Sequence, residues 1–503
     1  MSRSVVDRWV EQQTMEKEEK SDEIVDREEV LQKLRKKIFY QDIFNFIKLD
    51  HAERKQLLVN DKKENVIDRN DDLLDVDSGD DEYFRLITTV KPIDASDRKQ
   101  NGWGEVLWES YGPTLVFLES MMVPHLQWKH RNIKFSTFAI GYNWMQSNRK
   151  SGLRIKRKVE EYKQFLAERH QLEFDQIKVI MITHSMGGIA TRSACVLDDM
   201  ECDAVIHGAM PTHGSPATYY NAHCGYPLPA SLALGGDAPN VSAILGFCQG
   251  GLELLPNQHY VDSKGDPDWL KIENPDGSNT SISSKFPGIK IYDFYKNSER
   301  WYDFIHYKLL APESKENEGD DYIKANKTRI AATEKFHLDL DGKFHPHTTM
   351  IYSCNGDLQH QEPLGEFASH DNCRWQFTTH QFSYPFKKIE DPNNWQFYLK
   401  PTYPVVINKK SDIEYNRSII ENRTLSSKQP MKIQHAVLAD PISAGDGTVQ
   451  IGSGHHASAF NPIKKIAIES ENTHQNFWQS ETAMLELEKR ITQLTKAIHS
   501  GAI

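Results

Sequence analysis

One stretch, residues 177–190, constrains the fold of this chain more than any other. Its first part, Ile177–Ile182, is rich in β-branched and apolar side chains, which is typical of a short strand buried on both faces. The chain then turns at Ser185 and continues in a helical pattern that opens with Met186-Gly187-Gly188. A strand, a sharp turn that carries serine, and a helix therefore follow one another directly.

This order is that of the nucleophile elbow, which presents the catalytic serine in α/β-hydrolases. The strained turn lifts the Ser185 hydroxyl above the sheet edge, and small residues after it let the helix pack close to the strand. The backbone N–H of Met186 then points at the place where a carbonyl oxygen becomes negative. Thr183 stands where the usual Gly-x-Ser-x-Gly motif has its first glycine, so an ordinary buried strand ending in a serine turn is the alternative.

The segments around the elbow predict a mostly parallel sheet of the α/β class. Strand-like patterns recur at 133–140, 204–210 and 347–354, and helical patterns at 106–122 and 153–166 alternate with them. Such alternation is typical of βαβ units. The chain ends in a helical stripe of apolar residues: Met484, Leu487, Ile491, Leu494 and Ile498. We therefore expect an α/β-hydrolase fold.

The remaining segments predict additions to this fold. Residues 1–100 are polar and charged with a helical stripe, so we expect a mainly helical or partly disordered extension before an α/β-hydrolase domain at 101–503. Residues 215–345 contain apolar sequence interrupted by glycine, which suits a mobile cover and an ordinary packed subdomain equally well. Residues 358–440 are aromatic and polar with little periodicity. We expect these last two ranges to be insertion or lid regions.

Composition excludes several classes of function. The formal net charge of −11 argues against a nucleic-acid partner. The six cysteines show no zinc-ligand spacing, and the acidic run Asp71–Glu82 does not match an EF-hand, so we expect no metal and no cofactor. No apolar run approaches ~20 residues, and residues 1–6 lack a signal-peptide core. We therefore expect no membrane span, and a cytoplasmic location in the cell that makes the protein.

The other members of a serine-centred catalytic set must come from later in the chain. A base has to take the serine proton and an acid has to hold the base in one tautomer, in the chain order serine, acid, histidine. His474 lies just before the terminal helix and is the first choice of base, with His455 and His456 as rivals. Asp446 and Asp357 compete as the acid, because both follow strand-like segments in glycine-containing turns.

Several segments resemble known lipases. Thr183–Gly188 and Gly445–Val449 are similar to motifs of lecithin:cholesterol acyltransferase-like and GPI inositol-deacylase-like lipases. A closer resemblance, covering about residues 100–480, is to bacterial lipases of the type VI secretion effector class. It rests on Gly102-Trp-Gly-Glu105, Gly141-Tyr-Asn-Trp144, Val205-Ile-His-Gly-Ala-Met-Pro211 and Gly251-Leu-Glu-Leu-Leu-Pro256.

The resemblance implies a serine esterase that hydrolyses acyl esters of membrane phospholipids. It also implies an antibacterial role after type VI secretion into the periplasm of a target cell, with a cognate immunity protein and a secretion-apparatus component as partners. In such lipases the aspartate of Gly-Asp-Gly-Thr-Val is the triad acid, which favours Asp446, and the His-Gln pair before the last helix favours His474. A lipid acyltransferase and a catalytically impaired binding or delivery protein stay as alternatives.

One departure from these lipases concerns the second oxyanion donor. They usually carry a Pro-Gly-x-Met-Gly-Ser-like loop, and no such loop precedes Gly102 in this sequence. Tyr83–Val90 has a strand-like pattern, but Lys91-Pro-Ile-Asp94 follows it. Removal of one oxyanion donor typically lowers the rate ~10²–10³-fold, so the sequence leaves this part of the site unassigned.

Overall fold

A four-stranded, all-parallel sheet forms the centre of the protein in the computed structural model. The structure describes residues 95–119, 133–226, 235–262, 264–274, 276–300, 302–310, 316–354, 373–382, 405–406, 431–438, 445–450, 453 and 464–503. The strands, in their order across the sheet, are β1 (Ile180–His184), β2 (Ala204–Gly208), β5 (Thr348–Ser353) and β9 (Lys464–Ile468). Every residue of β2 and β5 is buried, as expected for inner strands of a parallel sheet.

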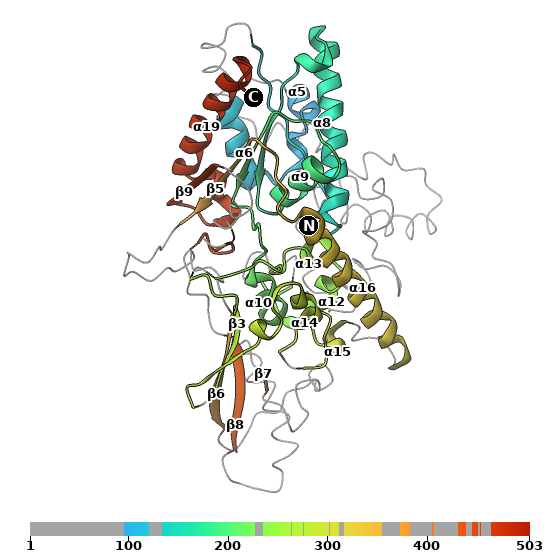
Figure 1. Ribbon diagram of the computed structural model, residues 1–503, viewed down its shortest axis with the longest axis vertical. Helices are drawn as coiled ribbons and strands as arrows, with labels where there is room; N and C mark the ends of the chain where they lie inside the picture. The colour runs from blue at the N-terminus through green and yellow to red at the C-terminus, as the bar shows by residue number, and fades with distance from the viewer. Residues whose placement is uncertain are drawn as a thin grey trace, which may run out of the picture.

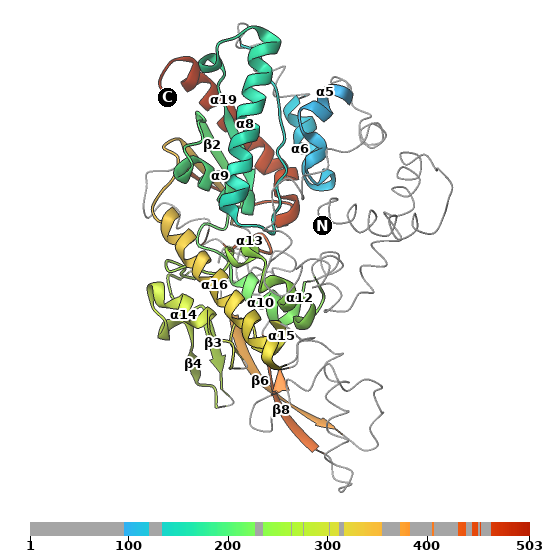
Figure 2. The same cartoon turned by 90° about the vertical axis from the view of Figure 1, so that its right-hand side faces the viewer.

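Helices cover both faces of this sheet (Figures 1 and 2). They are α5 (Ala95–Gln100), α6 (Trp108–Phe117), α8 (Asn148–His170), α9 (Met186–Leu197) and α19 (Glu481–His499), with the short 3-10 helices η3 (Trp103–Glu105), η5 (Phe174–Gln176) and η11 (His474–Gln479). On one face Leu487 of α19 packs in one apolar cluster with Ile206 of β2. On the other face Ile189 of α9 packs with Met350 of β5. The sheet is therefore the middle of three layers.

The chain between β2 and β5, residues 209–347, builds a second part of the molecule, drawn below the sheet in Figure 1. This β2–β5 connection contains α10 (Pro216–Cys224), α12 (Ala238–Leu245), α13 (Gln249–Leu252), β3 (Leu270–Glu273), β4 (Asn279–Ser281), η6 (Ser283–Lys285), η7 (Gly288–Lys290), α14 (Ile291–Tyr295), α15 (Tyr307–Leu310) and α16 (Glu316–Leu340). A second sheet, in the order β4-β3-β6-β8-β7, adds β6 (Cys373–Phe382), β7 (Val405–Val406) and β8 (Met431–Leu438). Trp375 of β6 is fully buried against α10, where its Nε1 donates to the Tyr219 hydroxyl at 2.9 Å.

The buried side chain of Glu253 fastens the β2–β5 connection to the start of α8. Its carboxylate accepts hydrogen bonds from the Asn148 backbone N–H at 2.7 Å, from the Asn148 side chain at 2.8 Å and from the Ser147 hydroxyl at 3.0 Å. A negative charge at a helix N-terminus is favourable because the first N–H groups there lack intrahelical acceptors. Nearby, a Cβ on Gly250 would lie 2.3 Å from the Trp144 carbonyl oxygen, so only glycine allows this close approach.

The structure confirms the α/β fold and most of the predicted central elements. The strands predicted at 204–210 and 347–354 are β2 and β5, and the elbow strand is β1. The expected full burial of the elbow strand is wrong: four of its five residues are half-buried, because β1 lies at the edge of the sheet in the described part of the chain. The terminal stripe is α19, whose residues Leu487, Ile491 and Leu494 pack against the sheet. β9 and the second sheet have no counterpart among the predicted strands.

The strand predicted at 133–140 is wrong: in the described part of the chain this segment pairs with no strand. Its backbone polar groups have other partners. The Thr137 carbonyl accepts from the side chains of Asn101 and Trp103, and the Thr137 N–H donates to Glu119 at 2.7 Å. Side chains therefore satisfy groups that a strand ladder would otherwise use.

The predicted domain boundaries, at 1–100, 101–503, 215–345 and 358–440, stay predictions. Residues 1–94, including the acidic run Asp71–Glu82, lie outside the described residues, as does most of 358–440. None of the helices that the structure describes combines the length and apolar character needed to cross a bilayer.

The Glu253→Gln variant tests the cost of burying this carboxylate. Burial raises the pKa of Glu253 to about 7, although hydrogen bonds from Asn148, Ser147 and Gln249 oppose the rise. A raised pKa means that this group's contribution to stability is complete below about pH 4.5 and is lost as the pH rises through about 7. As the pH rises from about 4.5 to 8, we expect the free energy of unfolding of the variant, measured in urea, to increase by roughly 3 kcal/mol relative to that of the wild type.

Glu201→Gln serves as the control, because it also removes one carboxylate, but from an exposed side chain that pairs with Lys163 at 3.7 Å. If the difference between Glu253→Gln and the wild type does not change over this pH range, the proposed cost of the buried carboxylate is wrong.

Candidate active site

Ser185 occupies a sharp turn between β1 and α9. Its backbone has φ 50° and ψ −129°, a conformation that non-glycine residues rarely adopt and that typically costs ~1–3 kcal/mol. Two hydrogen bonds hold it: the Ser185 N–H donates to the Gly208 carbonyl at 2.9 Å, and the Ser185 carbonyl accepts from the Gly188 N–H at 2.9 Å. A Cβ on Gly188 would lie 2.7–3.0 Å from the side chain of Met210, so the first turn of α9 packs tightly on the sheet.

Thr183, which replaces the usual glycine, has a specific partner on the neighbouring strand. Thr183 of β1 lies opposite His207 of β2, and the Thr183 Oγ1 is 2.8 Å from the His207 Nδ1. Both residues are buried. Burial lowers the pKa of His207 to about 3, with Arg192 the next cause, so the imidazole is neutral. The threonine hydroxyl therefore forms a buried hydrogen bond between the two strands where glycine would leave the histidine nitrogen unpaired.

The segment after β9 brings His474 to the end of β1. Phe477 and Trp478, in the same short helix η11, are buried beneath the strand ends. The Trp478 Nε1 donates to the Thr183 carbonyl at 3.0 Å, and a Cβ on Gly208 would lie 2.3 Å from the Trp478 ring. The absence of a side chain at 208 is therefore what allows the indole to lie across the end of β2.

Asp446 lies in a tight turn that is held on two sides. The Asp446 N–H donates to the Val449 carbonyl at 3.3 Å and closes the turn. Gly447 has φ 92°, a backbone conformation that favours glycine. The Gly445 carbonyl accepts from the Ser353 hydroxyl at 2.9 Å, at the end of β5. The Thr448 carbonyl accepts from the Ser215 hydroxyl at 2.8 Å, at the start of α10. Both parts of the molecule thus position this turn.

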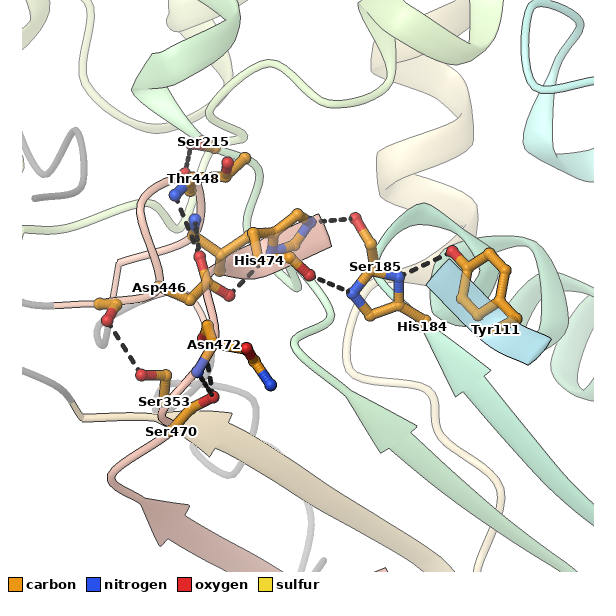
Figure 3. Close-up of polar contacts among 12 residues, drawn as sticks. Tyr111, His184, Ser185, Ser215, Ser353, Asp446, Thr448, Ser470, Asn472 and His474 are labelled. Atoms are coloured by element: carbon orange, nitrogen blue, oxygen red, sulfur yellow. Dashed lines mark hydrogen bonds and ion pairs between the residues drawn. The ribbon is translucent and has the colours of Figure 1, made fainter. Parts of the chain in front are cut away.

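The structure brings the three predicted side chains Ser185, Asp446 and His474 together (Figure 3). The His474 Nε2 is 2.7 Å from the Ser185 Oγ, and the His474 Nδ1 is 2.7 Å from the Asp446 Oδ2. The other Asp446 oxygen accepts from the backbone N–H groups of Thr448 and Val449. Because a carboxylate only accepts, His474 carries its proton on Nδ1 and presents the Nε2 lone pair to the serine hydroxyl.

His184, beside the serine, fixes the backbone of His474. Its Nε2 donates to the His474 carbonyl at 2.8 Å, so its Nδ1 accepts from the Tyr111 hydroxyl at 2.9 Å (Figure 3). Desolvation, with a smaller effect of the His474 ring, lowers the pKa of His184 to about 3. Burial raises the pKa of Tyr111 to about 12. Both groups therefore stay neutral over the physiological range and keep this hydrogen-bond direction. The sequence patterns did not indicate this role for Tyr111 or His184.

Met186 is the first residue of α9, immediately after Ser185. The first N–H groups of a helix have no acceptor within it, and they point outward from its start. This position agrees with the expected role of the Met186 N–H as an oxyanion donor, which stays a prediction. The segments Tyr83–Val90 and Lys91–Asp94, where a second donor was sought, lie outside the described residues.

His455, His456 and Asp357 all lie outside the described residues. Among the residues that are described, no group of three or more His, Cys, Asp or Glu side chains is arranged to hold a metal ion. The expectation of no metal and no cofactor stays a prediction.

Comparisons with known proteins extend the fold assignment. No protein-family model matches the sequence, and a search of curated proteins finds no match either. A chain of the solved structure described as "The crystal structure of Tle4-Tli4 complex" is similar, with a TM-score of 0.63 and 20% sequence identity over 91% of this chain and 91% of that chain. This likeness, together with the parallel sheet and the strand–turn–helix at Ser185, shows the α/β-hydrolase fold.

The Tyr111→Phe variant tests whether the Tyr111–His184 pair positions His474. Without the hydroxyl, the His184 Nδ1 loses its donor and the ring is no longer restricted to the tautomer that donates to the His474 carbonyl. One net hydrogen bond contributes about 0.5–1.5 kcal/mol, so we expect a fluorophosphonate probe to label Ser185 roughly 2–10-fold more slowly. The measurement is the labelling rate followed by mass spectrometry.

Tyr162→Phe is the matched control, because it also loses one hydroxyl, which donates to the Ala139 carbonyl at 3.0 Å away from the serine. Equal slowing in both variants, or no slowing in Tyr111→Phe, would count against the positioning role.

Proposed function

We propose that the protein is a serine esterase that hydrolyses acyl esters of membrane phospholipids and acts as an antibacterial type VI secretion effector. The observation that carries the catalytic part is the position of His474, with Nε2 at 2.7 Å from the Ser185 hydroxyl and Nδ1 at 2.7 Å from the buried Asp446 carboxylate. The lipid and effector parts rest on the sequence resemblance and on the shared fold with the chain of the Tle4–Tli4 complex.

Acylation begins with attack of the Ser185 Oγ on the carbonyl carbon of the ester. As the new C–O bond forms, the serine proton moves to the His474 Nε2, and the carbonyl oxygen becomes an anion that accepts from the Met186 N–H. Asp446 stabilises the imidazolium through the Nδ1–H bond. His474 then gives its proton to the leaving alcohol oxygen, the ester C–O bond breaks, and the acyl group stays on Ser185.

Deacylation repeats these steps with water in place of serine. His474 takes a proton from water as its oxygen attacks the acyl carbon, and it returns the proton to the Ser185 Oγ as the fatty acid leaves. If an alcohol takes the place of water, the product is a new ester, and each residue keeps the same role. Hydrolysis and acyl transfer are therefore distinguished by their products and not by the triad residues.

A protein partner belongs to the same proposal. The similar solved structure is a complex of Tle4 with Tli4. By that analogy, and because the sequence resembles secreted lipase effectors, we propose that this chain binds a cognate immunity protein of its own and a component of the secretion apparatus.

The Ser185→Ala variant tests the proposed activity directly. The hydroxyl is the attacking group, so its removal should lower fatty-acid release by at least about 10³-fold, because loss of a triad member typically has effects of this size or larger. The assay uses vesicles of phosphatidylethanolamine and phosphatidylglycerol, with fatty acids measured by mass spectrometry and a lysolipid added to reveal transacylated product.

Ser500→Ala controls for the substitution, since Ser500 is exposed at the end of α19. Equal release by the wild type and Ser185→Ala would sink the esterase proposal. Failure of the wild type both to release fatty acid and to react with a fluorophosphonate would favour the impaired binding protein.

Asp446→Asn separates the two candidate acids. An asparagine keeps the shape of the side chain but offers a donor as well as an acceptor to the His474 Nδ1, which favours the wrong tautomer. We expect fatty-acid release to fall about 10³–10⁴-fold, whereas the same change at the rival acid, Asp357→Asn, should leave the rate within a factor of about two, as expected for a residue without a transition-state role. The reverse pattern would assign the acid to Asp357.

A further inference from the structure

Cys195 and Cys202 lie together at the end of α9 that is remote from Ser185. Cys195 is in the last turn of the helix, and Cys202 is in the loop that leads to β2. At ~1.5 Å per helical residue, the ten residues from Ser185 to Cys195 span about 15 Å. The two sulfur atoms are 3.7 Å apart, and both cysteines are free.

The backbone around the two thiols holds them at this separation. The Met200 N–H donates to the Ala194 carbonyl at 2.9 Å, and the Asp203 N–H donates to the Val179 carbonyl at 2.8 Å. A disulfide bond is ~2.0 Å long, so bond formation requires the sulfur atoms to approach by less than ~2 Å. Side-chain torsions supply movements of this size without a change of backbone.

The surroundings of the pair decide which thiol reacts first with a soluble oxidant. Both cysteines are half-buried, whereas Cys224, Cys248 and Cys373 are buried. The hydrogen bond with Cys195 raises the pKa of the Cys202 thiol well above its ordinary value, and burial adds to this, while His345 acts in the opposite direction. Because only a thiolate attacks a disulfide, the raised pKa makes Cys202 the poorer first nucleophile, and we assign the first attack to Cys195.

We propose that Cys195 and Cys202 form an intramolecular disulfide when the protein meets a small-molecule disulfide such as oxidised glutathione. The Cys195 thiolate attacks one sulfur of the oxidant, which releases one glutathione thiolate and leaves a mixed disulfide. The Cys202 thiol loses its proton to solvent and attacks the Cys195 sulfur, which releases the second glutathione. Two protein thiols are oxidised and one glutathione disulfide is reduced to two thiols.

The bond would join the end of α9 to the loop before β2, and so close a short loop next to the central sheet. It would form after the protein leaves reducing conditions, since reducing compartments keep thiols free. It does not depend on the proposed esterase activity, and it leaves Ser185 untouched.

The experiment treats the full-length, folded protein with oxidised glutathione and then blocks the remaining thiols with an alkylating agent. A protease that cleaves before aspartate cuts at Asp198 and Asp199, between the two cysteines. Mass spectrometry should then find the peptides of Cys195 and Cys202 joined, with neither cysteine alkylated. The midpoint of thermal unfolding should rise by roughly 2–6 °C over that of the reduced protein.

Two variants sharpen the test. In Cys202→Ser the second attack is impossible, so one glutathione should stay attached to Cys195. Cys354→Ser should behave as the wild type, because Cys354 is also half-buried but its thiol donates to the Ile468 carbonyl. The proposal fails if the treated wild type keeps both thiols, retains glutathione on Cys195, or joins either cysteine to a different one. The wild-type result decides the question even if a variant does not fold.

Discussion

The packing of Trp478 over Gly208 is the contact on which the candidate active site depends most. His474 comes from a segment that follows the last strand of the sheet, almost three hundred residues after the serine. The indole of Trp478, four residues further on, fills the space above Gly208 and donates to the Thr183 carbonyl, so it holds the segment that carries His474 near Ser185. Any side chain at 208 would displace the indole, and the histidine would move with it.

The same contact lies beside the strained backbone of Ser185. The Gly208 carbonyl accepts a hydrogen bond from the Ser185 N–H. Gly208 therefore leaves space for the Trp478 ring and also stabilises the turn at Ser185. Strain of this kind persists only where surrounding contacts over-determine it. The buried pair Thr183–His207 lies directly beneath and ties β1 to β2 at the level of the turn. The polar groups of the site are thus supported by a buried hydrogen bond between two strands and by the packed indole of Trp478.

The sequence predicted the parts of the fold that local patterns encode. The inner strands β2 and β5 are continuous apolar runs, and the elbow is a contiguous motif, so each could be read from neighbouring residues. β9 could not, because it is a short edge strand that begins with Lys464 and Lys465 and lies partly exposed. The segment 133–140 failed for the opposite reason: its pattern suits a strand, but side chains from distant positions take its hydrogen bonds.

The candidate active site could be predicted only where its residues belong to contiguous sequence motifs. The turn Gly445–Val449 and the histidine before the last helix carry such signals, whereas Tyr111 does not. Its role depends on the distance to His184, which belongs to a different element, and no spacing in the sequence specifies that distance. The second sheet was not predicted for a similar reason: β3 and β6 pair across about a hundred residues, and no pattern in the sequence links the two segments.

The turn of Asp446 shows why the two parts of the molecule cannot be considered independent. Ser353, at the end of β5, holds one side of the turn, and Ser215, at the start of the β2–β5 connection, holds the other. Glu253 fastens the same connection to α8, which in turn packs on α9 through the close approach of Gly152 to Ala190. A displacement of the connection would therefore act on Asp446 through Ser215 and on Ser185 through α8 and α9. The distances around His474 depend on both paths, so the connection is part of the structure that sets the geometry of the candidate site.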